Sequence, residues 1–220
     1  MWRCSCSLCY AAPMMTRILA AALLAAIPAL TFAQAPAPPA PSSATQAELV
    51  PVAIDTSAGR IVVALDKTHA PITTANFLHY VDTHRFDGEN FYRAMHVGTG
   101  GLIQGGVRSD ARKLYPAIKH EPTSQTGLRN VAGAIAMANA GPGTAQADFF
   151  ILASDIPSLD AKSDEPGFAV FGHVVEGMDV VNKILVSPVS ATNGEGPMKG
   201  QMLEPVIKII KAARVQPSKP

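Results

Sequence analysis

The sequence predicts a mainly β protein built on a closed antiparallel barrel, and three observations lead to this fold class. Short apolar or alternating runs recur from residue 50 onward, and turn-forming residues separate them. Only two segments have a helical pattern, and they lie near the two ends of this region. Many strands with a helix near each end are typical of a barrel that carries a helix at each mouth.

The predicted strands are short runs rich in Val, Ile, Ala and Phe. They cover residues 50–56, 60–65, 91–95, 102–105, 133–138, 149–152, 168–175 and 206–213. The turn Ser57-Ala58-Gly59 separates the first two runs, which therefore form a β-hairpin.

Two helices are predicted, at residues 71–82 and 179–185. Pro71 suits the first position of a helix, because the missing N–H is not needed there. The segments 98–101, 109–129 and 139–147 are predicted as a glycine-rich turn, a long surface loop and a second loop.

Residues 1–35 are predicted to be an N-terminal extension followed by a secretory signal peptide. Arg17 precedes an apolar run at 18–30, and Ala33 and Ala35 are small residues that suit signal peptidase. We therefore expect cleavage near Ala33 or Ala35 and a periplasmic or secreted product; the alternative is an uncleaved N-terminal anchor. Residues 36–48, rich in Pro and Ala, are predicted to be a disordered tether to a folded domain at 49–214, and residues 215–220 a loose tail.

Cysteine and charge narrow the possible functions. Cys4, Cys6 and Cys9 all precede the apolar run, so the mature chain has no cysteine and no disulfide. These cysteines suggest either a metal site or, more simply, an upstream extension with translation starting at Met14 or Met15 rather than Met1. Without the leader, 16 basic residues face 17 acidic ones, which gives no electrostatic basis for binding nucleic acid or anionic lipid.

One cation and one amide lie among apolar and small residues near the middle of the chain. Arg93 follows two aromatic residues, and Gln104 precedes two glycines. No nucleophile motif or phosphate loop accompanies them, and the histidines show no spacing typical of zinc. A reaction that needs one fixed positive donor and an apolar pocket fits this set, and rotation about an X–Pro peptide bond is such a reaction. No cofactor or metal is expected.

Five segments occur in a specific order: 91–93, 104–106, 133–138, 149–151 and 171–181. Together they resemble the cyclophilin peptidyl-prolyl isomerases, most closely the secreted bacterial branch, over roughly residues 50–213. The resemblance implies an eight-stranded closed antiparallel β-barrel capped by two α-helices, with a cyclophilin-like isomerase domain at 49–214. It also implies cis–trans isomerisation of X–Pro bonds without cofactor or metal.

The resemblance implies one catalytic residue, Arg93, with substrate-binding residues around it. The substrate-binding set is Tyr92, Leu102, Gln104, Ala138, Asn139, Ala140, Asp148, Phe150, Leu159 and Phe168. The backbone of 138–140 is expected along the bound peptide, and Leu102, Phe150 and Leu159 in the proline pocket. The expected partners are proline-containing unfolded or exported polypeptides, and the protein is expected to be a monomer without stable membrane insertion.

Several positions depart from the family's pattern. Three extra residues lie between Arg93 and Gln104, and Gly101 stands where the family has a pocket phenylalanine. Asp148, Ser158 and Phe168 replace a glutamine, a tryptophan and a histidine. Because part of the apolar wall is changed, a proline-peptide-binding folding helper with little turnover is an alternative to the isomerase. An unrelated barrel that carries apolar ligands would have no use for the Arg93–Gln104 pair.

The residues themselves also allow structural roles. Arg93 could form an ion pair, and Gln104 could be a satisfied buried amide. Phe150 could be core or pocket wall, whereas Phe149, which alternates with it, is expected in the core. Asp148 could replace an amide at the pocket rim or be solvated and inert.

Inhibitors of the cyclosporin type are predicted to bind weakly. Ser158 and Gly101 remove two aromatic groups that such ligands contact in the family, and a buried aromatic can contribute about 2 kcal/mol to an interface. We expect binding weaker by at least about a hundredfold than in a member that keeps both aromatics, at about 1.4 kcal/mol per tenfold. Titration calorimetry measures this affinity, and nanomolar binding would contradict the prediction.

Overall fold

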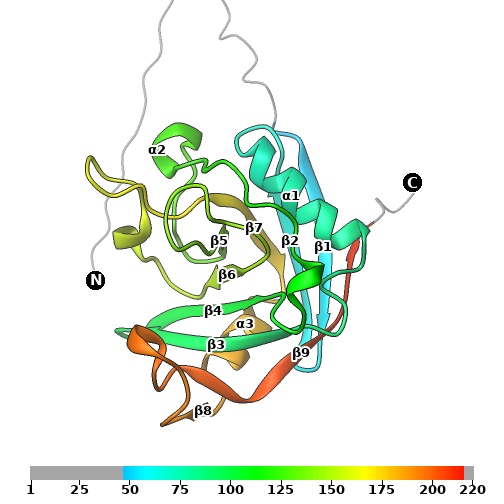
Figure 1. Ribbon diagram of the computed structural model, residues 1–220, viewed down its shortest axis with the longest axis vertical. Helices are drawn as coiled ribbons and strands as arrows, with labels where there is room; N and C mark the ends of the chain where they lie inside the picture. Colours follow the sequence, from blue (N-terminus) through cyan, green and yellow to red (C-terminus); the bar gives the residue numbers. More distant parts are fainter. Residues whose placement is uncertain (1–46, 216–220) are drawn as a thin grey trace, which may run out of the picture. The chain divides into compact units, whose positions relative to one another are not determined.

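The structure is a computed structural model that describes residues 47–215. The predicted signal peptide, most of the predicted tether and nearly all of the predicted tail lie outside the described residues. Within the described range, nine strands form one sheet (Figure 1). They are β1 Leu49–Thr56, β2 Gly59–Asp66, β3 Asn90–Val97, β4 Gly100–Gly106, β5 Ala134–Met137, β6 Phe149–Leu152, β7 Val170–Glu176, β8 Val189–Ser190 and β9 Met202–Arg214.

The sheet closes into a barrel, as the sequence predicts. Its strand order is β1-β2-β7-β5-β6-β4-β3-β9, and a further pairing between β1 and β9 joins the two edges. Every pairing is antiparallel, and β8 is a two-residue strand that pairs only with β9, outside the ring of eight. Because a closed barrel has no free edge, nearly all backbone groups of these strands can be paired.

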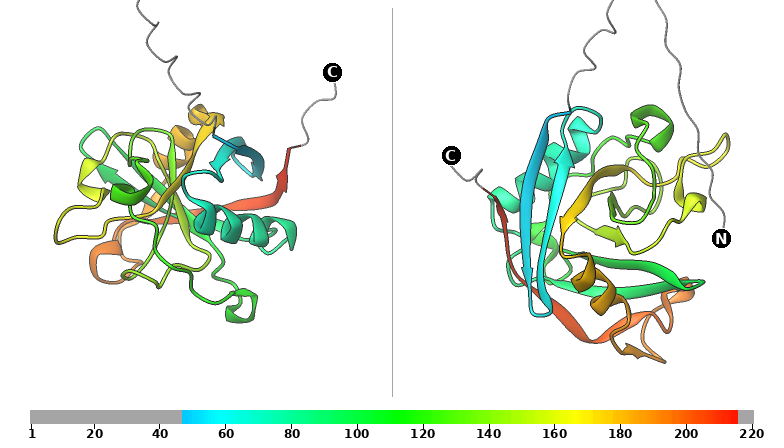
Figure 2. Two further views of the ribbon diagram at one scale, coloured as in Figure 1. Left: turned by 90° about the horizontal axis from the view of Figure 1, so that it is seen from above. Right: turned by 180° about the vertical axis from the view of Figure 1, so that it is seen from behind.

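Two helices pack apolar residues against the barrel, as predicted. They are α1 Pro71–Asp82 and α3 Met178–Leu185, and they lie over opposite ends of the barrel (Figure 2). Phe77 of α1 meets Phe149 and Phe171 of the barrel, with ring centroids 5.2 Å apart in each pair. Val181 and Ile184 of α3 are fully buried. The core therefore fills the barrel and extends under both helices.

The structure corrects several predicted boundaries. The segment 109–129 is not a continuous loop, because it contains a 3₁₀ turn at Ala111–Lys113 (η1) and the one-turn helix α2, Thr123–Thr126. The strand predicted at 168–175 begins at Val170, because Gly167 adopts a φ of 62° and the N–H of Phe168 bonds to the carbonyl of Leu159. The turn predicted at 98–101 shrinks to two residues, so the extra residues before Gln104 lengthen the β3–β4 hairpin. Two further 3₁₀ turns, η2 and η3, occupy Pro157–Leu159 and Gly196–Met198.

The carboxylate of Glu121 caps the N-terminus of α1, although it lies far away in the sequence. Ala70, which precedes the helix, has no side chain that can accept the first N–H groups. Glu121, only 2% exposed, accepts hydrogen bonds from the N–H groups of Ile72 and Thr73 and from the Thr73 hydroxyl. The negative charge also lies at the positive end of the helix, where it is favourable. The 109–129 segment is thereby fastened to α1.

Glu121→Ala is predicted to lower the free energy of unfolding by about 2 kcal/mol, because it leaves buried N–H and hydroxyl donors without an acceptor. Urea denaturation measures the change. The matched control is Glu165→Ala, which removes an exposed carboxylate that pairs with Lys162 on the surface; its effect should stay below about 0.5 kcal/mol. Equal effects of the two substitutions would contradict the role of Glu121.

Candidate active site

A β-bulge in β3 sets the direction of the side chains at the site. Phe91 pairs with Gly105 and Arg93 with Gln104, so Tyr92 is an extra residue opposite β4. Phe91 and Ala94 both belong to the barrel core. Two residues, Tyr92 and Arg93, therefore lie between successive inward positions, and both point to the outer face. A regular strand would alternate and send one of them inward.

The strand register continues this row across the sheet. Arg93 lies opposite Gln104, Gln104 opposite Phe150 of β6, and Phe150 opposite Ala136 of β5. Cross-strand neighbours on one face have side chains within contact distance. Residues that are far apart in the sequence are thus brought together on the outside of the barrel.

Arg93 is held by directed hydrogen bonds to two glutamines. Its Nη1 donates to Gln104 Oε1 at 2.8 Å, while its Nε and Nη2 donate to Gln201 Oε1 at 2.9 and 2.7 Å. Nη2 also lies 3.2 Å from the sulfur of Met95. Burial lowers the pKa of Arg93, yet an arginine still keeps its charge at neutral pH. No carboxylate among residues 47–215 forms a salt bridge with Arg93, so the ion-pair alternative does not describe this residue.

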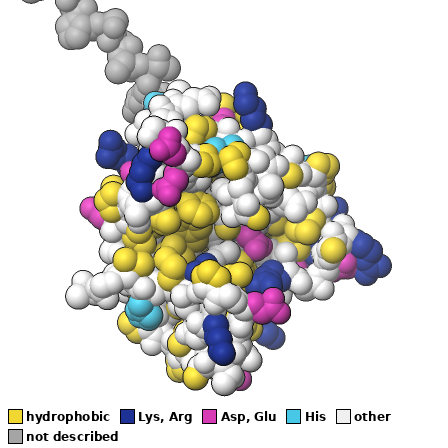
Figure 3. All heavy atoms as spheres, turned by 60° about the vertical axis from the view of Figure 1, so that its left-hand side comes forward, with side chains coloured by type: hydrophobic (Ala, Val, Ile, Leu, Met, Phe, Trp, Pro, Cys, Tyr) yellow, Lys and Arg dark blue, Asp and Glu magenta, His cyan; other side chains and the backbone are white. Residues whose placement is uncertain are grey.

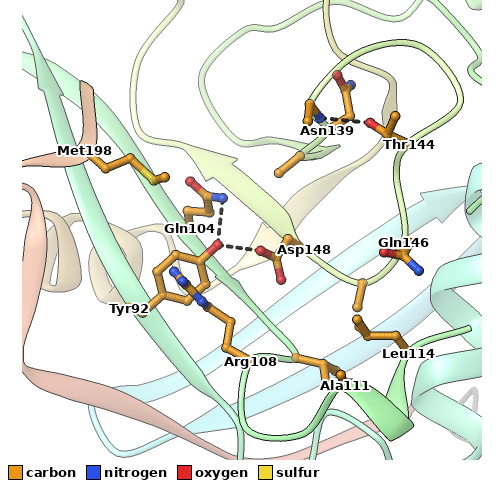
Figure 4. A pocket seen from close by; sticks show the side chains of 14 residues that line it. Tyr92, Gln104, Arg108, Ala111, Leu114, Asn139, Thr144, Gln146, Asp148 and Met198 are labelled. Carbon is orange, nitrogen blue, oxygen red and sulfur yellow. Dashed lines mark hydrogen bonds between the residues drawn. The ribbon is translucent and has the colours of Figure 1, made fainter. Parts of the chain in front are cut away.

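The network extends from Gln104 to a carboxylate. Gln104 Nε2 donates to the Tyr92 hydroxyl at 2.7 Å, and this hydroxyl donates to Asp148 Oδ2 at 2.7 Å (Figure 4). Burial raises the pKa of Asp148, and burial together with the Asp148 charge raises the pKa of Tyr92. The guanidinium of Arg108 lies 4.5 Å from the centre of the Tyr92 ring. Asp148 is thus a bonded, partly buried group rather than a solvated one.

An apolar cavity of about 300 Å³ lies beside Arg93. We call it the apolar cavity; it is lined by Arg93, Met95, Leu102, Gln104, Ala138, Asn139, Phe150, Leu159, Phe168, Pro197 and Met198. Phe168 meets Phe150 edge to face, with centroids 5.3 Å apart. Figure 3 shows apolar side chains gathered in a hollow on this side of the molecule. Phe149 faces the barrel core, as its alternation with Phe150 predicts.

A second, more polar cavity of about 480 Å³ adjoins the first and shares Gln104, Ala138, Asn139 and Met198 with it. We call it the polar cavity; its other lining residues include Tyr92, Arg108, Ala140, Thr144 and Asp148 (Figure 4). The structure therefore brings all ten predicted substrate-binding residues and Arg93 to these two cavities.

Residues 138–140 line the two cavities, and part of their backbone is available to bind a peptide. The N–H of Ala138 donates to Asp148 O, and that of Ala140 to Thr144 Oγ1. Within residues 47–215, neither the N–H nor the carbonyl of Asn139 has a hydrogen-bond partner. An extended peptide lying along this segment would find one donor and one acceptor there.

Sequence reasoning missed the residues that the C-terminal part of the chain contributes. Pro197 and Met198 of η3 line the apolar cavity, and Gln201 holds Arg93 across 108 positions of sequence. Gln201 is itself positioned, because its Nε2 donates to the Pro197 carbonyl at 2.8 Å and its own carbonyl accepts from the N–H of Ala94. Arg108 was also missed. Nothing in the local sequence marks these residues.

Gly101 cannot carry a side chain in this backbone. Its φ is 151°, and a Cβ there would lie 2.0 Å from the carbonyl oxygen of Met95. The family has an aromatic side chain at this position; here the backbone conformation leaves no room for one. Met95, Phe168 and Met198 line the apolar cavity in its place. Ser158, at the tryptophan position, is exposed in η2.

The sequences of known proteins lead to the same class of protein as this geometry. Residues 51–213 match the family described as cyclophilin type peptidyl-prolyl cis-trans isomerase/CLD. Peptidyl-prolyl cis-trans isomerase A of Dickeya dadantii is 38% identical, over 73% of this chain and 84% of the relative. A peptidyl-prolyl cis-trans isomerase of Acinetobacter baylyi is 36% identical, over 63% of this chain and 73% of the relative. The chain therefore belongs to the cyclophilin-type isomerases, and its reaction is the cis–trans isomerisation of X–Pro peptide bonds.

Solved structures support the same fold. A cyclophilin type peptidyl-prolyl cis-trans isomerase of Cryptosporidium parvum superposes with a TM-score of 0.63 at 20% identity, covering 77% of this chain and 99% of that one. A second crystal structure of that protein, in the presence of the dipeptide Ala-Pro, gives a TM-score of 0.62. Across residues 47–215, no helix is long and apolar enough to cross a membrane.

Asp148→Asn is predicted to stabilise the fold more at neutral than at acid pH. The pKa of Asp148 is raised by burial, so the folded protein holds this proton more tightly than the unfolded chain. Asp148 contributes its full share of the free energy of unfolding at pH values below the ordinary pKa of aspartate. This contribution is lost as the pH rises through the raised pKa that Asp148 has in the folded protein. Asparagine removes that loss and can still accept a hydrogen bond from Tyr92.

Urea denaturation of both proteins at pH 3 and pH 7 measures this difference. The matched control is Asp164→Asn, at an exposed aspartate, which should change the free energy of unfolding by less than about 0.5 kcal/mol at each pH. If Asp148→Asn raises the free energy of unfolding by the same amount at both pH values, the prediction is wrong.

Proposed function

We propose that Arg93 accelerates X–Pro rotation by donating a hydrogen bond to the proline nitrogen as the peptide bond twists. The barrier of about 18–20 kcal/mol comes from the partial double-bond character of the C–N bond. In the twisted state the proline nitrogen regains its lone pair, and a donor aimed at it stabilises that state more than either planar isomer. Each lowering of the barrier by about 1.4 kcal/mol increases the rate tenfold.

The observation that supports this role best is the way Arg93 is held at the edge of the apolar cavity. Gln104 and Gln201 fix the guanidinium through three hydrogen bonds. The contact with Met95 uses a weak acceptor, because a thioether sulfur binds N–H groups poorly. At least one N–H of the guanidinium is thus easily redirected to a substrate, and no large reorganisation is needed in the reaction.

The apolar cavity suits the proline ring of a substrate. Leu102, Phe150, Leu159 and Phe168 provide apolar contacts, and Arg93 reaches the same space. Because cis and trans X–Pro forms differ by only about 0.5–1 kcal/mol, a site must accept both and favour the twisted form between them. The structural neighbour crystallised in the presence of Ala-Pro supports a small proline-containing ligand.

We also propose that the peptide backbone lies along residues 138–140 and that its neighbouring side chains reach the polar cavity. The open N–H and carbonyl of Asn139 support this placement. Gln104 has a double part: its amide oxygen holds Arg93, while its amide nitrogen is bonded to Tyr92. Its contribution is then to position Arg93 at least as much as to contact the peptide.

The clients of this isomerase, in our proposal, are exported polypeptides in the periplasm or outside the cell. The support comes from the sequence: a charged Arg17, an apolar run at 18–30 and small residues at Ala33 and Ala35. The Pro/Ala-rich segment that follows would separate the isomerase domain from the point of cleavage.

Arg93→Ala is predicted to lower kcat/KM for proline peptides by about a hundredfold or more, the loss that follows removal of one preorganised transition-state donor. A protease-free isomerisation assay followed by NMR line shapes measures it, and circular dichroism checks the fold. Arg60→Ala, which removes a surface arginine 3.5 Å from Asp55, is the matched control and should keep full activity. A folded Arg93→Ala protein with wild-type activity would refute the mechanism.

Export is predicted to yield a mature chain that begins soon after Ala33 or Ala35. N-terminal sequencing of the protein recovered from the extracytoplasmic fraction of an expressing bacterium gives the cleavage point. A control that replaces both Ala33 and Ala35 with bulky residues should block or displace cleavage, since signal peptidase requires small residues. An uncleaved, membrane-bound product of the unaltered chain would show that the segment is an anchor.

A further inference from the structure

Met95 occupies an unusual position beside the catalytic cation. It follows Ala94 of the core, so it points to the same outer face as Arg93. Its sulfur lies 3.2 Å from Nη2 of Arg93, and its side chain is only partly buried and lines the apolar cavity. A small solute that enters this cavity can therefore reach the thioether.

We propose that Met95 is an oxidation site through which peroxides switch the isomerase off. This inference rests on the proposed function, because it requires that Arg93 act on the substrate. The sulfur lone pair attacks one oxygen of hydrogen peroxide, the O–O bond breaks, and proton transfer completes a molecule of water. The thioether is oxidised by two electrons to a sulfoxide, and the peroxide is reduced by two electrons.

The change at the sulfur alters what it can do to Arg93. A thioether is a weak acceptor, so Nη2 can leave it for a substrate. A sulfoxide carries a polar oxygen, which accepts a charge-assisted hydrogen bond from the guanidinium. That bond would compete directly with the proline nitrogen for the same donor. The added oxygen would also make a wall of the apolar cavity polar, which disfavours a proline ring.

Among the methionines of the described chain, Met95 is the one whose sulfur Arg93 contacts. Residues 47–215 contain no cysteine, so methionine provides all of their sulfur. Met137 is 1% exposed in the barrel core and is protected by burial. Met198 is also partly exposed and lines both cavities, but no hydrogen bond from Arg93 reaches it in this structure. Met137 and Met198 therefore serve as internal controls, one for access and one for contact with Arg93.

The experiment treats the purified protein with increasing hydrogen peroxide and follows two readouts. Peptide mass spectrometry gives the fraction of sulfoxide at each methionine, and the isomerase assay gives kcat/KM. We expect Met95 to be oxidised well before Met137, and kcat/KM to fall about tenfold when Met95 is fully oxidised, which corresponds to about 1.4 kcal/mol. Methionine sulfoxide reductase should restore the activity.

Two variants locate the effect, each compared with its own untreated sample. Met95→Leu should keep most of its activity after treatment, whereas Met198→Leu should lose activity like the wild type. The proposal is overturned if Met95 stays reduced while Met137 is oxidised, if fully oxidised Met95 leaves kcat/KM unchanged, or if Met95→Leu is inactivated as strongly as the wild type. These outcomes are separate from failure of the proposed function, which an active Arg93→Ala protein alone would show.

Discussion

One extra residue in β3 decides where the functional side chains point. Between the inward-facing Phe91 and Ala94 the strand holds two residues instead of one, so Tyr92 and Arg93 both face outward. Without that bulge, alternation would turn either the cation or the phenol into the barrel, where a charge without a partner is costly. The register of β3, β4 and β6 then places Gln104 and Phe150 in the same row. The bulge and the strand register therefore determine which side chains meet at the site.

Hydrogen bonds from distant segments give Arg93 one orientation. Gln104 comes from the neighbouring strand, and Gln201 from the segment after η3, which is itself fixed through Pro197 and Ala94. The guanidinium has lost most of its side-chain freedom before a substrate arrives, so less entropy must be lost in the reaction. Tyr92 and Asp148 continue the network on the other side of Gln104. A barrel that closes on itself provides the rigid frame that such a network requires.

Much of this could be predicted from local sequence. Alternating runs and turn residues mark the strands, and Arg93, Gln104 and Phe150 lie within motifs that keep the family's order. The remainder depends on contacts that no local pattern records. Gln201, Pro197 and Met198 follow α3 in an irregular segment and reach the site only because β9 pairs with β3. Asp148 was ambiguous in the sequence, because only the bulge brings the Tyr92 hydroxyl within hydrogen-bond distance of it.

Gly101 also limits how this protein can change over generations. At its φ of 151°, a Cβ on Gly101 would lie 2.0 Å from the carbonyl oxygen of Met95 in the facing strand. A codon change that places an aromatic residue at 101 would not by itself rebuild that wall, because the local backbone would first have to move. Substitutions that change the substrate range without moving the backbone are therefore expected at Met95, Phe168 and Met198, which line the apolar cavity.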